Sequence, residues 1–261
     1  MTLVRALGII PAVLVPARNV HCLSLLLGLA LAGCAGGTET GNPSLTGQLS
    51  YSGVSSDPAA IGVRRGGGVA TVKNAWFALD QVTVSSAGDC GVKGGSGFSV
   101  SALGIGDHAA GVHNATDFEA TAGAFCSVDL PFVPVAIDDT KAPAELRGHG
   151  IVVAGELADG TPFLVESDQA PLVRLQGAAN GFELSAAAPN ALIAFDFATW
   201  LADVDWAAAS VDGGRISVSE GSNSELLRNF EGQLAAGVAL YRDSDGDGVL
   251  DAPPVLLANA P

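Results

Sequence analysis

Runs of β-forming residues, separated by turn formers, recur along most of the chain. In residues 69–85 both alternating faces carry apolar side chains, which is typical of a strand covered on both sides. Asp80 and Gln81 predict a bend within this run. Further strands are expected over residues 48–52, 98–103, 116–121, 124–133, 148–156, 162–167, 172–176, 181–185, 191–197 and 215–219.

Three turn signals predict how some of these strands pair. Asp159-Gly160 lies between two β-rich runs and favours a tight hairpin. Asn180-Gly181 predicts a second hairpin, and Ala122-Gly123 predicts a third. We therefore expect the strands on either side of each turn to be antiparallel neighbours.

The periodicity becomes helical near the end of the chain. Ser222 and Glu225 fit a capping box, in which each side chain accepts from a backbone amide of the first turn. The apolar residues that follow recur at the spacing of one helix face. We expect an amphipathic helix over residues 223–241, packed on the sheet, and a short additional helix over 196–202 that Trp200 anchors.

Composition supports strands and turns rather than helices. The chain holds 34 glycines, and only 15% of its residues are charged. The expected fold is mainly β: an antiparallel β-sandwich with one C-terminal amphipathic helix and a short additional helix. Residues 124–133, which carry Phe125 and Val128 after a short turn, resemble the edge motif of transthyretin-like and other carbohydrate-module-like β-sandwiches. The resemblance implies an Ig/transthyretin-like sandwich.

A short apolar run near the N-terminus predicts where the protein is sent. Residues 23–30 follow Arg5 and Arg18 and are too few to cross ~30 Å of hydrocarbon as a helix, which is typical of a secretory signal. Leu31-Ala32-Gly33-Cys34 closes the run and resembles the lipobox of bacterial lipoproteins. The resemblance implies cleavage before Cys34, which then carries diacylglyceryl on sulfur and an acyl chain such as palmitate on nitrogen. An ordinary cleaved signal, or an apolar core segment with a chance cysteine, is the alternative.

The segment after that cysteine extends the prediction. Residues 37–43, GTETGNP, resemble the corresponding segment of a group of uncharacterised bacterial lipoproteins. Ala35, in place of an Asp that would retain the protein at the inner membrane, favours the outer membrane. We expect residues 1–33 to be removed as a signal peptide, 34–46 to form a flexible tether, and 47–261 to form a single domain.

Charge and cysteine content restrict the partners and the chemistry. The formal net charge is −15, and it becomes −17 once the predicted signal is removed, because that segment holds two of the 12 basic residues and none of the 27 acidic ones. Such a surface argues against nucleic acid as a partner and favours divalent cations. Cys22 is discarded and Cys34 lipidated, so Cys90 and Cys126 are expected to form a disulfide in an oxidising compartment. Two buried free thiols are the alternative.

One stretch near the C-terminus carries a pattern with clear chemistry. Carboxylates spaced two residues apart converge when the chain curls, and Gly248 permits the sharp turn. The stretch resembles the calcium loop of EF-hands, dockerins and related DxDxDG repeats, including the helix that is expected before it. The resemblance implies calcium ligands at loop positions 1, 3, 5, 7 and 9, which are Asp243, Asp245, Asp247, the Val249 carbonyl and Asp251.

The loop departs from the EF-hand at its twelfth position. Pro254 stands where that family has a bidentate Glu, and Pro253-Pro254 forbids an ordinary exit helix. The missing ligand weakens binding and excludes a calmodulin-type switch, so the expected cofactor is a structural Ca²⁺. An acidic surface turn without metal is the alternative.

Other candidate groups show weaker patterns. Two imidazoles and a carboxylate occur within seven residues, at Asp107, His108 and His113, and suit zinc or copper, although the pattern favours a solvated loop. Carboxylate pairs, which surface loops also explain, occur at Asp138-Asp139 and at Glu166 and Asp168. The sequence contains no nucleophile elbow, HExxH, P-loop or Rossmann fingerprint.

These patterns predict a lipid-anchored, non-catalytic protein of the bacterial envelope. Its role is expected to be binding or scaffolding, with a carbohydrate or a protein as the candidate ligand. The alternative is a carbohydrate-active or other hydrolase on the same scaffold, because glycosidase carboxylates have no short signature. A third interpretation, metal sensing or transport, requires His108 and His113 to converge with further ligands.

Overall fold

Most of the strands that the sequence predicts are present, and they form two sheets. The computed structural model describes residues 43–54, 61–62, 69–91, 96–101, 104–107, 114–178 and 181–261. All of these residues belong to one compact unit of the chain, 41–261. The predicted signal, Cys34, His108 and His113 lie outside the described residues.

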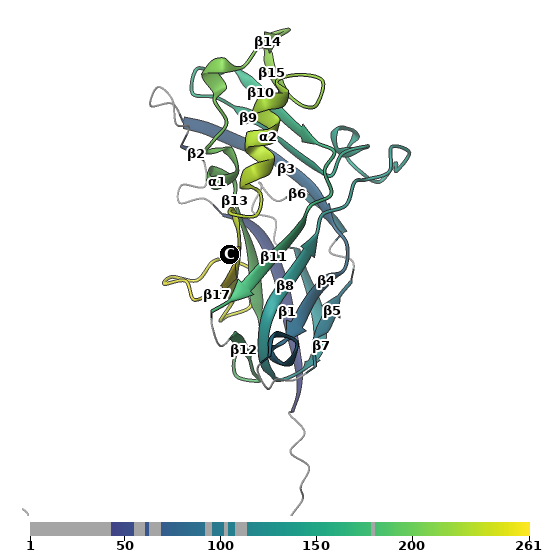
Figure 1. Cartoon of the computed structure of the whole chain (residues 1–261), viewed down its shortest axis with the longest axis vertical. Coiled ribbons are helices and arrows are strands. Elements are labelled where there is room, and N and C mark those ends of the chain that lie inside the picture. The colour runs from purple at the N-terminus through teal and green to yellow at the C-terminus, as the bar shows by residue number, and fades with distance from the viewer. Residues whose placement is uncertain are drawn as a thin grey trace, which may run out of the picture. The chain divides into compact units, whose positions relative to one another are not determined.

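The first sheet contains strands from both ends of the described chain (Figure 1). Its spatial order is β5 (Phe98–Val100), β4 (Val82–Ser86), β8 (Gly123–Pro131), β11 (Leu172–Gly177), β17 (Leu256–Asn259), β16 (Val238–Arg242), β13 (Ala191–Asp196), β1 (Ser44–Val54) and β7 (Asn114–Thr121), with β12 (Phe182–Leu184) also paired to β8. β1 begins before the expected Gln48, because Ser44 already pairs with Thr121 of β7. The ordered strand therefore includes the last residues of the predicted tether.

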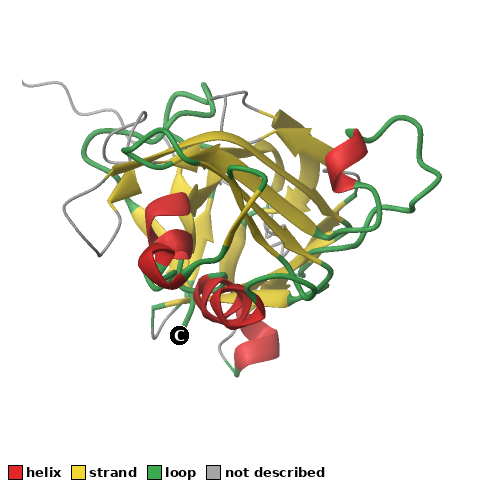
Figure 2. Cartoon of the chain, turned by 90° about the horizontal axis from the view of Figure 1, so that it is seen from above, coloured by secondary structure: helices red, strands yellow, loops and turns green. Residues whose placement is uncertain are grey.

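The second sheet is formed by the middle of the chain. Its spatial order is β14 (Val211–Asp212), β15 (Arg215–Val218), β10 (Pro162–Ser167), β9 (Ile151–Glu156), β3 (Val69–Leu79) and β2 (Ile61–Gly62), with β6 (Gly104–Asp107) also paired to β3. The helical segments are α1 (Phe197–Leu201), α2 (Ser224–Gln233) and the 3₁₀ turns η1 (Ala87–Cys90), η2 (Ala144–Leu146) and η3 (Trp206–Ala208). Figure 2 shows the helices outside the strands, at the periphery of the sheets.

The prediction of a mainly β fold is confirmed, but the sheets are mixed and not purely antiparallel. β1 runs parallel to β13, with Leu49 opposite Ala191, and β10 runs parallel to β15, with Phe163 opposite Ile216. Each parallel pair joins strands that are distant in sequence, as parallel pairing requires a crossover connection. Apolar alternation specifies which face of a strand is buried and carries no information on the direction of its neighbour.

One of the three predicted hairpins is confirmed. β9 and β10 pair across Asp159-Gly160, where Gly160 has φ +84°. The hairpin at Asn180-Gly181 is wrong, because β11 and β12 both run antiparallel to β8, along its residues 127–131 and then 123–125. β12 therefore runs in the same direction as β11. The hairpin at Ala122-Gly123 is also wrong, since β7 pairs with β1 and β8 pairs with β4, β11 and β12.

The first sheet curls until its two end strands meet, and one continuous core lies inside. The rings of Phe98 in β5 and Phe118 in β7 stack with centroids 4.5 Å apart. Phe77 of the second sheet packs against Phe195 of the first, with ring centroids 4.6 Å apart, so the core extends across both sheets. The bend predicted at Asp80-Gln81 is present, and it carries the chain from β3 in the second sheet to β4 in the first.

The C-terminal helix is shorter than predicted. α2 ends at Gln233, and the second half of the predicted range forms β16, so the prediction of a helix to Tyr241 is wrong there. The capping box is also wrong: the N-cap is Asn223, with φ +54°, and its side chain bonds to backbone atoms of Ser210 and Ser217.

The short helix predicted over 196–202 is present as α1. None of the described helices has the length and apolarity needed to cross a membrane.

The side chain of Cys90, one half of the predicted disulfide, lies outside the described residues. η1, which ends at Cys90, directly follows β4 and packs against β8, the strand that carries Cys126. The Cys126 side chain is buried, and its Sγ lies 3.1 Å from the carbonyl oxygen of Ser86. The pairing therefore stays a prediction that chemistry can test directly.

We expect reduction, or replacement of Cys126 with serine, to lower the free energy of unfolding by about 2–4 kcal/mol, because a crosslink restricts the unfolded chain. Urea denaturation with and without reductant measures this loss. Mass spectrometry of the unreduced protein, digested after alkylation, should show Cys90 and Cys126 in one linked peptide pair. Alkylation of both residues without prior reduction would contradict the prediction.

Candidate metal centre

The predicted calcium loop connects two strands, β16 and β17, which pair antiparallel with Leu240 opposite Ala258. The loop therefore follows a strand and not a helix, and the EF-hand resemblance fails at its incoming element. The physical reason is the early end of α2: residues 238–242 pair with β13 and β17 instead of continuing the helix. The DxDxDG stretch, residues 243–248, still curls as the sequence predicts, although neither of the elements beside it is a helix.

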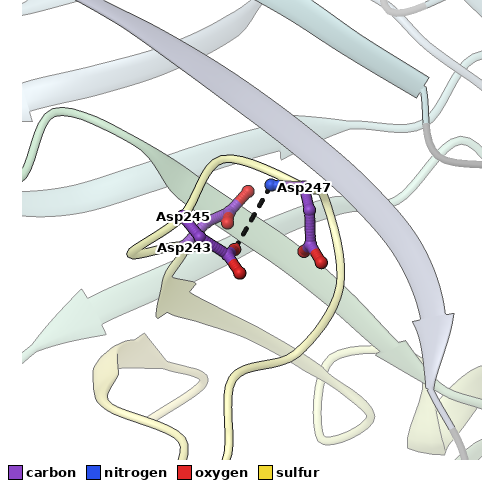
Figure 3. Close-up of side chains that lie close together, drawn as sticks. All are labelled: Asp243, Asp245 and Asp247. Atoms are coloured by element: carbon purple, nitrogen blue, oxygen red, sulfur yellow. Dashed lines mark hydrogen bonds between the residues drawn. The ribbon is translucent and has the colours of Figure 1, made fainter.

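Three carboxylates of this loop converge (Figure 3). One oxygen from each of Asp243, Asp245 and Asp247 lies within 4.8 Å of the others. The Asp243 side chain is only 1% exposed, whereas Asp245 and Asp247 are exposed. The site thus has one buried acid at its base and two acids open to solvent, and the group can hold a metal ion.

Asp243 organises the loop from within. Its Oδ1 accepts a hydrogen bond from the Gly246 amide at 2.8 Å, and its Oδ2 accepts one from the Gly248 amide at 3.1 Å. Burial raises the pKa of Asp243 above its usual value, and the charges of Asp247 and Asp245 add to this, while the two amide hydrogen bonds act in the opposite direction. A cation between the three carboxylates would relieve the same repulsion.

Two further features hold the loop in this shape. Asp247 Oδ1 accepts from the Val249 amide at 2.7 Å, an Asx turn that fixes the orientation of the carboxylate. Gly246 has φ +74°, and a Cβ at this position would lie 2.8 Å from the side-chain nitrogen of Asn190. Only glycine therefore satisfies both the backbone conformation and the close approach.

Asn190 is a residue of this site that the sequence does not reveal. Its carbonyl accepts from the Asp243 amide at 3.3 Å, and its side-chain oxygen accepts from the Gln48 amide in β1 at 3.0 Å. Asn190 directly precedes β13, so it ties the loop to two other strands of the first sheet. A single Asn before an apolar run gives no sequence signal for such a role.

The remaining predicted ligands stand apart from the three converging acids. Asp251 lies outside the group, and its Oδ2 accepts from the Ser244 amide at 2.9 Å. Hydrogen bonds from the Ser244 hydroxyl and then from this amide lower the pKa of Asp251. That bond closes the loop by joining its start to its end. Val249 exposes 46% of its surface and donates its amide to Asp247.

Two acids of the weaker candidate groups, Asp107 and Asp139, accept hydrogen bonds from nearby groups. Asp107 accepts from the Asn74 side chain at 2.8 Å and from the Ala75 amide at 3.1 Å, while its two predicted histidine partners lie outside the described residues. Asp139 accepts from the Lys141 amide at 2.8 Å, which is an ordinary turn contact. These acids have structural partners in the parts of the chain that are described.

Glu166 and Asp168 face the same histidine. His149 Nδ1 is hydrogen-bonded to Asp168, and its Nε2 lies 3.8 Å from Glu166. Ser167, between the two acids, donates instead to Glu231 of α2 at 2.6 Å. The Ser167 hydroxyl therefore donates to a carboxylate and not to the imidazole of His149. Ser167 and His149 thus do not form a pair of nucleophile and general base.

Comparison of the chain with protein-family models, with curated proteins and with solved structures finds no match.

Proposed function

We propose that this protein is a lipid-anchored, non-catalytic component of a bacterial envelope, with a binding or scaffolding role and a structural Ca²⁺ in the loop 243–251. The observation that carries the metal assignment is the convergence of three carboxylates within 4.8 Å, with the innermost one buried and fixed by two backbone amides. The lipobox-like Leu31-Ala32-Gly33-Cys34 supports the anchor.

The donor set favours calcium over other cations. All three acids offer oxygen, which suits hard cations and not the softer transition metals. Calcium accepts six to eight ligands in flexible geometry, so backbone carbonyls and water can complete a site that lacks the bidentate Glu of the EF-hand. Affinity of about 10⁻⁴–10⁻³ M, as in extracellular modules, is expected for such a site.

The position of the loop supports a structural role for the ion. The loop joins β16 to β17, and Asn190 connects it to β13 and β1, so an ion here would hold four neighbouring strands of the first sheet. An ion that binds only the folded state stabilises the folded protein by mass action.

Calcium titration tests the metal assignment. We expect calorimetry of the purified protein to show binding, and the melting temperature to rise in calcium relative to chelator. Asp247→Asn should reduce the affinity at least about tenfold, because it removes a charged ligand while its amide oxygen can still accept from Val249.

Asp159→Asn is the matched control, because Asp159 is exposed and its Oδ1 accepts from the Thr161 amide at 2.8 Å in the same i to i+2 pattern. It should leave the calcium response unchanged. The assignment fails if the native protein shows neither heat nor a thermal shift at 10 mM calcium.

Replacing Cys34 with serine tests the anchor. In a bacterial host that processes lipoproteins, the native protein should incorporate labelled palmitate and sediment with membranes, whereas Cys34→Ser should lose the label and leave the membrane fraction. Cys22→Ser is the control, since Cys22 lies in the part expected to be removed. Equal membrane association of the Cys34→Ser variant and the native protein would contradict the proposal.

A further inference from the structure

A groove of about 310 Å³ lies on the second sheet, far in sequence from the metal loop. Its floor is formed by Trp76 of β3, Ala154 of β9 and Leu164 of β10. These side chains belong to a small apolar cluster with Leu146 that is separate from the main core. The groove therefore lies on the face of the sheet that is turned away from the main core.

Trp76 is the aromatic platform of this groove. The residue is partly buried, and it packs against the small apolar cluster rather than against another ring. Within the described part of the chain, its indole N–H has no acceptor. A partly buried tryptophan in a concave site offers both an apolar face and a hydrogen-bond donor to a ligand.

The rim of the groove carries four charges that sum to zero. Lys73 and Glu156 form an ion pair across β3 and β9. Glu145 in η2 and Arg215 in β15 are both exposed, and neither has a charged partner among the described residues. Local neutrality is notable in a chain whose formal net charge is −15. Donors and acceptors of both signs therefore surround the aromatic floor without favouring a charged ligand.

We propose that this groove binds a neutral saccharide. One face of a pyranose ring is lined with C–H groups that can lie on Trp76, while its hydroxyls both donate and accept and can pair with Arg215 and Glu145 at the rim. An anionic ligand would meet two carboxylates, and a cationic one would meet two cations. The assignment rests on the proposed binding role, because it names the site and the ligand class for that role. Saccharide binding in this groove requires neither calcium nor the lipid anchor.

Glycan and peptide arrays test the assignment on the same labelled protein. We expect retention on neutral mono- or oligosaccharides, weaker retention on acidic ones, and none on peptides. Calorimetry with the strongest neutral saccharide of the array then gives the affinity. Trp76→Ala and Arg215→Ala should each lower this affinity by about tenfold or more, as central contacts of an interface do.

Arg228→Ala is the matched control, because Arg228 is an exposed arginine of α2 outside the groove. It should leave the affinity unchanged. The proposal is overturned if no neutral saccharide is retained, if peptides are retained instead, or if both groove variants bind as tightly as the Arg228→Ala variant. Repeating the saccharide titration in chelator separates the two proposals: saccharide binding that persists in chelator, in a protein that shows neither heat nor a thermal shift with calcium, would reject the metal assignment alone.

Discussion

Replacing Trp200 with alanine is expected to lower the free energy of unfolding by about 3–5 kcal/mol, the range for removing a large buried aromatic side chain. Trp200 is fully buried at the end of α1. Its ring centroid lies 5.8 Å from that of Phe77 in β3 and 6.0 Å from that of Phe230 in α2. The indole thus joins both helices to the second sheet, and its loss opens a cavity at that junction.

The surroundings of the indole make it difficult to replace. Its Nε1 donates to the Leu234 carbonyl at 3.0 Å, and a Cβ on Gly237 would lie 2.3 Å from its Cδ1. Trp200→Phe removes this donor and should cost about 1–3 kcal/mol. Gly237→Ala should also destabilise the protein although Trp200 is retained, because neither the ring nor the backbone has space to move.

Urea denaturation, monitored by circular dichroism, measures these losses in the free energy of unfolding. Trp76→Ala is the control, since Trp76 is only partly buried on the outer face of the second sheet and should cost clearly less. Equal losses for the Trp200 and Trp76 variants would show that the junction of α1, α2 and β3 does not carry the stability assigned to it.

Local signals in the sequence predict local structure well. The bend at Asp80-Gln81 separates β3 from β4 as expected, because two consecutive polar residues interrupt an apolar run. The short helix was predictable for a similar reason: Asp196 accepts from the amides of Ala198 and Thr199 and so forms an ordinary N-cap. In both cases the deciding residues are neighbours in the chain.

Long-range pairing was not predictable from the same patterns. Val238 fits a helix face together with Tyr241, and it fits one face of a strand equally well together with Leu240. The choice is made by β13, in which Ile193 pairs with Leu240. The metal loop shows the same limit. Spacing alone predicted that its first three acids converge, whereas the contribution of Asn190 depends on a contact with Gln48, 142 residues away.

Replacing Asp243 with alanine is expected to destabilise the protein more than any other change in the metal loop. The variant leaves the amides of Gly246 and Gly248 without their acceptor, which costs about 1–3 kcal/mol even in chelator. It also removes calcium binding, and that adds about 1.4–2.7 kcal/mol when calcium exceeds the dissociation constant ten- to a hundredfold. The total in calcium is therefore expected to reach about 2–6 kcal/mol.

The two contributions can be separated by comparing Asp243→Ala with Asp247→Asn, in calcium and in chelator. Asp247→Asn keeps the loop hydrogen bond and should lose only the calcium-dependent part, whereas Asp243→Ala should lose both. Because the pKa of Asp243 is raised, protons compete with the cation there, and calcium affinity should fall as the pH is lowered towards that pKa. If Asp243→Ala loses the same stability in calcium as in chelator, the buried carboxylate shapes the loop and holds no ion.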